Sequence, residues 1–384
     1  MKKIIIIGIL LIVSIVSIFT PNREVEASTE LRGVFISYIE EKRYLSGEEN
    51  ISKENIDLMI NNIKNNKFNL VILQVRSASD AIYKSYIFPW SSILTGEEGR
   101  EYFDILDYFI EKCHENDIYI YAWVNPYRVR TTEDISTISE ENPAFPYLDT
   151  DTIYINNGVF FNPSKQEVED LVVAGVEEIA KNYDVDGIMF DDYFYPSTDL
   201  DIEDYRNYIS NHDYMSIENY HLMVINHLIQ RVYSICHKYG KIFGVSPDGN
   251  IDNNYSYIFA DIYTWLSSEG YVDFIMPQIY YGFFNETMPF YPTIQIWDDI
   301  IKNNKIKLIV ALAIYKSGNV DLYAKSGSDE WLRNSNIIVR EVLLARNLKH
   351  YEGFVLFRYD NIFTEEVMNL NSYQEFKNLQ KILN

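Results

Sequence analysis

Residues 185–196 read Val-Asp-Gly-Ile-Met-Phe-Asp-Asp-Tyr-Phe-Tyr-Pro, a short apolar run that ends in two adjacent carboxylates and a group of aromatic rings. The apolar part has the length and composition of a β-strand covered on both faces. A carboxylate leaves water only at a cost unless it is paired or hydrogen-bonded, so stability alone does not explain Asp191 and Asp192. Two interpretations stay open: one aspartate caps the next loop while the other binds an arginine, or the pair forms the floor of an active site.

Short apolar strands alternate with amphipathic helical segments along the rest of the chain. The spacing predicts strands over 31–38, 68–76, 118–125, 185–190, 241–247, 272–280, 307–315 and 353–359. It predicts helices over 52–66, 102–116, 165–183, 216–239, a segment through Ala260 and Leu266, 293–303, 329–347 and 365–383. This order indicates parallel strands joined by crossover helices. Eight such units favour a closed (β/α)₈ TIM barrel of the α/β class over an open doubly wound sheet. No linker interrupts the pattern, so we expect one domain over 28–384.

The first 27 residues follow a different pattern. Two lysines, an apolar run over 4–19 and the sequence Val25-Glu26-Ala27 are typical of a secretory signal that is cleaved after Ala27. The run is shorter than the roughly 20 residues of a comfortable transmembrane helix, and an uncleaved membrane anchor is the alternative. In both cases we expect the domain to be exported, to the outside of the cell or to its envelope.

Charge and residue usage argue against several functions. The net charge of −23 argues against a nucleic-acid partner, since phosphates are bound by lysine and arginine. None of the six histidines ends an apolar strand, which argues against a catalytic zinc, and no cofactor is expected. Cys113 and Cys236 stand in separate helical segments, and we interpret them as buried thiols, with a disulfide as the alternative.

Polar and aromatic residues follow the strands at their carboxyl ends, where a TIM barrel carries its active site. The candidates are Gln74, Arg76, Asp80, Trp90, Asn125, Tyr127, Arg128, Asp191, Asp192, Tyr193, Asp248, Gln278, Tyr280 and Arg358. They supply carboxylates for proton transfer, hydrogen-bonding groups for hydroxyls and rings for stacking on sugar faces, with no Ser–His pair and no metal cluster. That combination matches the hydrolysis of glycosidic bonds, which uses two carboxyl groups.

Several motifs also lie in order along the chain: LRGVFISY (31–38), QVR (74–76), DAIYKS (80–85), PWS (89–91), LTG (94–96), AWVNPYR (122–128), DGIMFDDYFYP (186–196), GVSP (244–247) and PQIY (277–280). Together they resemble the glycosyl hydrolase-like 10 family. The resemblance implies a TIM-barrel enzyme of the bacterial envelope that cleaves cell-wall glycan strands, particularly strands without stem peptides. One departure is Asp248, where many relatives have an aromatic or another residue.

Side chains alternate along a strand, so Gly187, Met189 and Asp191 share one face and Asp192 lies on the other. Because a glycine fits the crowded interior of a barrel, we predict that Asp191 faces inward as nucleophile or charge stabiliser. Asp192, at the rim, would bind a substrate hydroxyl or donate the proton. A proton donor needs a pKa that is raised by burial or by a neighbouring carboxylate.

The remaining roles keep their alternatives. Asp248 is either the second catalytic carboxylate or a turn residue. Arg76 and Arg128 are electrostatic partners of the acid pair or structural clamps, and Trp90 is a subsite ring or a buried loop anchor. The other candidates are predicted to contact the glycan substrate, and Gln278 and Tyr280 to bind its hydroxyl groups. The predicted function is a glycoside hydrolase acting on a cell-envelope polysaccharide. The alternatives are a non-catalytic carbohydrate-binding barrel and a metal-dependent deacetylase, for which the histidines offer no triad.

Overall fold

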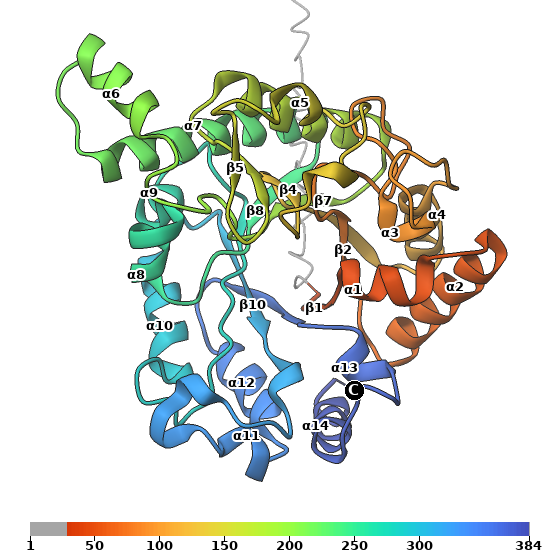
Figure 1. Ribbon diagram of the computed structural model, residues 1–384. Helices are drawn as coiled ribbons and strands as arrows, with labels where there is room; N and C mark the ends of the chain where they lie inside the picture. Colours follow the sequence, from red (N-terminus) through yellow and green to blue (C-terminus); the bar gives the residue numbers. More distant parts are fainter. Residues whose placement is uncertain (1–28, 384) are drawn as a thin grey trace, which may run out of the picture.

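The computed structural model describes residues 29–383, so the predicted signal or anchor segment lies outside the described residues. Eight parallel strands close into a barrel in the order β1-β11-β10-β9-β8-β7-β3-β2 (Figure 1). Their bounds are β1 Leu31–Ile36, β2 Leu70–Arg76, β3 Tyr119–Val124, β7 Gly187–Phe190, β8 Ile242–Val245, β9 Phe274–Ile275, β10 Lys307–Leu312 and β11 Tyr351–Leu356. The predicted TIM barrel is confirmed.

Helices surround the barrel, as each strand-to-strand crossover requires (Figure 1). The larger ones are α2 Glu49–Asn65, α4 Ile105–His114, α5 Gln166–Asn182, α7 Ile217–Lys238, α9 Ile262–Ser267, α10 Phe290–Ile300, α12 Ile337–Ala345 and α14 Leu370–Gln380. Their apolar stripes face the strands. In α2 the buried side chains Ile56, Met59, Ile60 and Ile63 recur at the three- and four-residue spacing of one helix face. Among residues 29–383, none of the helices combines the length and apolar character needed to cross a membrane.

The strand-to-helix connections carry structure that the sequence patterns did not predict. The predicted loop after β3 contains a three-stranded antiparallel sheet of β4 Arg128–Arg130, β6 Val159–Phe161 and β5 Ile153–Ile155. Helix α6, Ile202–Asn211, follows β7 and extends away from the barrel at the upper left of Figure 1. Short helical turns occupy other connections: α1 Tyr38–Glu40, η1 Glu41–Leu45, α3 Ser92–Thr95, η2 Ile135–Thr137, η3 Phe145–Tyr147, α8 Ile251–Asn253, η4 Asn254–Ile258, η5 Ile314–Lys316, η6 Leu322–Gly327 and α13 Asp360–Phe363.

One predicted helix is divided. The segment 329–347 forms α11 Glu330–Arg333 and then α12, with Asn334, Ser335 and Asn336 between them. Asparagine and serine side chains compete for backbone hydrogen bonds and so favour helix ends over helix interiors. The apolar periodicity on both sides of the break made the two helices look like one.

The barrel interior is a layer of apolar side chains separate from the larger core between strands and helices. It includes Tyr121, Met189, Phe274 and Val355. A Cβ added at Gly187 would lie 2.9 Å from the Ile242 side chain and 3.0 Å from the Tyr121 ring, so the interior leaves no room for a side chain there. In the outer core Cys113 and Cys236 are free and buried, as predicted.

Candidate active site

At the carboxyl end of the barrel, residues that follow or end all eight strands surround a cavity of about 390 Å³. Seven of the predicted site residues line it: Gln74, Arg128, Asp191, Asp192, Tyr193, Gln278 and Tyr280. The ends of strands that are distant in sequence therefore converge on one space, as the barrel geometry requires.

Asp191 is buried at the floor of the cavity and faces the barrel interior, as the alternation of side chains predicts. Its carboxylate accepts hydrogen bonds from Trp123 Nε1 at 2.9 Å and from Asn125 Nδ2 at 3.1 and 3.2 Å. A fourth comes from the backbone N–H of Tyr193 at 3.3 Å. Burial raises the pKa of Asp191, while the charge of Arg128 and these donors act in the opposite direction. The carboxylate is thus held in one orientation by groups that favour its ionised form.

Asp192 also lines the cavity, although the alternation places it on the opposite face from Asp191. It can do so because β7 ends at Phe190 and the chain bends at Asp192. Burial, and then the negative charge of Asp191, raise the pKa of Asp192 to about 7. A carboxyl group with this pKa keeps a large part of its protons at neutral pH, which is what a general acid needs.

Aromatic rings form much of the remaining wall. Phe35 lies edge-on to Trp123, with ring centroids 5.6 Å apart, and Tyr280 meets Tyr315 at 5.9 Å. The ring of Phe357 packs against the rings of Phe35, Tyr280 and Tyr315, with centroid distances of 5.5 to 5.9 Å. The cavity thus offers apolar ring surface beside two carboxyl groups, a combination suited to the apolar faces and the polar linkage of a sugar chain.

Arg128 joins the acid pair to the rim. Its guanidinium lies over the ring of Tyr193, 4.3 Å from the centroid, and its backbone N–H donates to Asn125 Oδ1 at 2.9 Å. Because Asn125 also holds Asp191, these residues tie the loops after β3 and β7 together. Asn125 itself supports Asp191 from behind and does not line the cavity.

Arg76 does not reach the acid pair. Its guanidinium stacks on Phe88, 3.7 Å from the ring centroid, and packs against Gly175 of α5 outside the barrel. The register explains this placement: Gln74 pairs with Trp123 but Arg76 pairs with Val124, so a bulge at Val75 turns Arg76 to the outer face. Strict alternation would have put Gln74 and Arg76 on the same side.

Asp248 has its own partners in the turn after β8. It accepts hydrogen bonds from the Asn250 N–H at 2.7 Å, Asn253 Nδ2 at 3.0 Å and the Tyr281 hydroxyl at 3.2 Å. It does not line the cavity. Of the two interpretations of Asp248, these contacts favour the turn residue over the second catalytic carboxylate.

The other predicted contacts also lie outside the cavity lining. Asp80 is buried, 3.8 Å from Arg130 and hydrogen-bonded to Ser91 at 3.0 Å. Tyr127 is fully buried, Trp90 packs against the outer core, and Arg358 pairs with Glu40. Each anchors a strand-to-helix connection, and nothing in the local sequence separates such anchors from residues that face the mouth.

The cavity contains residues that were not among the predicted substrate contacts: Phe35, Ser37, Tyr38, Ile39, Trp123, Met189, Ser246, Tyr315 and Phe357. Most follow a strand end and could have been proposed from position alone. Trp123 is different, because its contact with Asp191 depends on the β3–β7 register, in which Trp123 stands opposite Met189.

Comparisons with known proteins agree with this architecture. The sequence model of the family described as glycosyl hydrolase-like 10 matches residues 30–326. Glycosyl hydrolase YngK of Bacillus subtilis (strain 168) is 29% identical over 362 residues, which cover 86% of this chain and 68% of that protein. Glycosyl hydrolase DigH of Escherichia coli (strain K12) is 30% identical over 339 residues, covering 79% of this chain and 75% of DigH.

Among solved structures, the PgaB glycoside hydrolase domain from Bordetella bronchiseptica aligns with a TM-score of 0.56 at 12% identity, over 89% of this chain and 99% of that one. α-L-Fucosidase isoenzyme 2 from Paenibacillus thiaminolyticus aligns with a TM-score of 0.57 at 13% identity, over 92% of this chain and 49% of that one. At such low identity these two alignments show the fold alone. On the family match and the sequence relatives, the chain belongs to the glycosyl hydrolase-like 10 family.

Proposed function

We propose that this protein is a glycoside hydrolase that cleaves the glycan strands of a cell-envelope polysaccharide, with peptidoglycan as the substrate. The observation that carries the proposal is the acid pair itself. Asp191 and Asp192 meet at the floor of a ring-lined cavity, one fixed by four hydrogen bonds and the other with a pKa of about 7.

The two carboxyl groups suit different steps. Asp192, protonated, donates its proton to the glycosidic oxygen as the bond from that oxygen to the anomeric carbon breaks. Positive charge then develops on the sugar ring, and the ionised carboxylate of Asp191 stabilises it. Water adds to the anomeric carbon and returns a proton to Asp192. Environments that give neighbouring acids different tasks are a general feature of such sites.

The choice of substrate rests on family resemblance. The relatives are named glycosyl hydrolases, which supports a glycan as the substrate. Peptidoglycan is proposed from the family resemblance of the motifs between 31 and 280 taken together, and export is proposed from the pattern of residues 1–27. The aromatic walls of the cavity are consistent with this class of substrate.

Mass spectrometry of products from purified, peptide-free peptidoglycan strands tests the proposal. New masses at disaccharide intervals are expected with the wild-type protein. Asp191→Asn and Asp192→Asn should each lower the rate by about 100-fold or more. Asp184→Asn is the matched control, because Asp184 precedes the same strand but is exposed and pairs with Lys241. If the rate of the Asp191 variant falls by less than about tenfold, which corresponds to roughly 1.4 kcal/mol of activation free energy, Asp191 has no catalytic role.

One observation favours the non-catalytic alternative, a carbohydrate-binding barrel. Within the described residues, the carboxylates that line the cavity come only from Asp191 and Asp192, which are adjacent, and Asp248 is engaged in its turn. Binding of the glycan without release of reducing ends would establish that alternative.

A further inference from the structure

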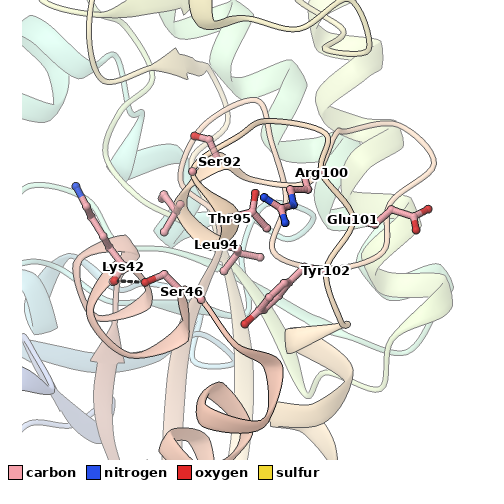
Figure 2. Close-up of a pocket in the computed structure, with 11 residues that line it drawn as sticks. Lys42, Ser46, Ser92, Leu94, Thr95, Arg100, Glu101 and Tyr102 are labelled. Atoms are coloured by element: carbon pink, nitrogen blue, oxygen red, sulfur yellow. Dashed lines mark hydrogen bonds between the residues drawn. The ribbon is translucent and has the colours of Figure 1, made fainter.

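A second cavity, of about 650 Å³, lies beside the connections that follow β1 and β2 (Figure 2). One wall comes from η1 and the residues after it, including Lys42 and Ser46. The other comes from the loop at 92–102, including Thr95 and Arg100. The motif Leu94-Thr95-Gly96 lies here and has no part in the site at Asp191.

The walls of this cavity are fixed by contacts within the protein. The N–H of Gly47 donates to the Leu94 carbonyl at 3.0 Å, which joins the two connections. Glu98, within the second connection, is paired with the buried Arg130. The space is therefore formed by the fold and needs no ligand to hold it open.

The polar groups of the cavity suit an acidic sugar. In the described part of the chain, Lys42 and Arg100 are exposed and neither lies within ion-pair distance of a carboxylate. Figure 2 shows the Arg100 guanidinium beside Thr95 and the Lys42 side chain on the other side of Leu94 with its ammonium end turned outward, while the Glu101 carboxylate points away from Arg100. The chain has a net charge of −23 and so repels anionic polymers in general, which makes a cavity lined by these two cations a candidate place for an anionic group.

The hydroxyl groups complete the set. Ser46 Oγ donates to the Lys42 carbonyl at 2.8 Å, and Thr95 Oγ1 donates to the Glu97 carbonyl at 2.8 Å. Thr95 Oγ1 also accepts from the Glu97 N–H at 3.3 Å. The lone pairs of Ser46 Oγ and the remaining lone pair of Thr95 Oγ1 can accept from the hydroxyl groups of a sugar.

The second cavity adjoins the same helical segment as the first. Tyr38 and Ile39, which line the cavity over Asp191, lie in α1, and Lys42 lies in the π-helical segment η1 that follows it directly. Tyr38 and Lys42 are therefore about one helical turn apart. A chain of sugars in the first cavity can extend along this segment toward the second.

We propose that the second cavity is a distal subsite that binds a carboxylate-bearing sugar of the glycan while another sugar lies over Asp191 and Asp192. Arg100 contacts the carboxylate through its fork of N–H donors, and Lys42, on its long flexible side chain, turns its ammonium group toward the same carboxylate. The inference rests on the proposed glycan substrate but not on hydrolysis.

Isothermal titration of the full chain carrying Asp191→Asn tests the subsite. The probes are peptide-free peptidoglycan oligosaccharides with free lactyl carboxylates, and the same oligosaccharides with these groups reduced to alcohols. We expect the acidic probe to bind about tenfold tighter than the reduced one, from two solvent-exposed ion pairs. Adding Lys42→Gln and Arg100→Gln should abolish this difference and leave binding of the reduced probe unchanged.

The control adds Lys305→Gln and Lys349→Gln, two exposed lysines in the connections before β10 and β11, and should keep the preference. The subsite is overturned if the Asp191→Asn protein binds both probes equally. It is also overturned if the lysine control loses the preference for the acidic probe as fully as the Lys42 and Arg100 variant does. Hydrolysis by the wild type separates the two proposals. If the wild type cleaves the glycan but the protein shows no preference for the acidic probe, only the subsite is refuted. If the preference depends on Lys42 and Arg100 but the wild type does not cleave the glycan, only the hydrolase is refuted.

Discussion

Replacing Trp123 by phenylalanine tests whether the protein holds Asp191 in its ionised form. The substitution keeps a ring in the barrel interior and removes the Nε1 donor, the shortest of the hydrogen bonds to this carboxylate at 2.9 Å. A hydrogen bond to a charged group contributes about 1.5–3 kcal/mol. At 1.36 kcal/mol per pKa unit, its loss should raise the pKa of Asp191 by about one to two units beyond the rise that burial already causes.

The sign of the effect follows from the role of Asp191. A charge stabiliser acts only when ionised, so a higher pKa moves the acidic limb of the rate profile upward by about one to two pH units. At acidic pH, below the pKa of Asp191, the rate of Trp123→Phe should be about 10- to 100-fold lower than that of the wild type. On the plateau of the profile the difference should be much smaller. The measurement is kcat/KM for glycan hydrolysis across the pH range of the profile.

Tyr121→Phe is the matched control, since Tyr121 stands two residues earlier in β3 and also belongs to the interior layer. It removes one polar atom without touching the acid pair, so the acidic limb should stay in place. An equal fall of the Trp123→Phe rate at every pH, with no movement of the limb, would refute the reasoning and point to lost packing. Urea unfolding of both variants measures that packing loss separately.

Three further predictions concern other buried charges. Asp192 has a pKa of about 7, so the wild-type rate should fall as the pH rises through that value. The Asp192→Asn variant should lose this basic limb of the pH–rate profile. A basic limb that persists in the variant contradicts the proton-donor role. Arg130→Met leaves the buried Glu98 and Asp80 without their cation and should cost about 3–5 kcal/mol in urea unfolding, whereas a change below about 1 kcal/mol would show the pairing to be unimportant. Glu341 is fully buried with both carboxyl oxygens unpartnered, so Glu341→Met should stabilise by about 1–2 kcal/mol. Burial raises the folded-state pKa of Glu341, and the wild type therefore loses stability as pH rises; the gain should be larger at high pH than at low pH, and an equal gain at both would contradict this.

The candidate site shows where strand-level reasoning works and where it fails. Counting residues along β7 correctly placed Gly187, Met189 and Asp191 toward the interior, because alternation is a local property of an extended chain. The same counting fails at Arg76, because the bulge at Val75 is set by pairing with β3 and leaves no mark in the sequence of β2.

The amino-acid sequence alone determined the order of the eight barrel strands and of the main crossover helices, and with them the barrel and the end at which its polar residues gather. Those features depend on the periodicity of apolar residues, which each segment carries within itself. Tertiary structure decided which of the gathered residues share the cavity. It placed Trp123 against Asp191, gave Asp192 its pKa of about 7 and kept Asp248 in its turn. These outcomes depend on register, bulges and the burial of one charge beside another, which arise only when segments distant in sequence pack together.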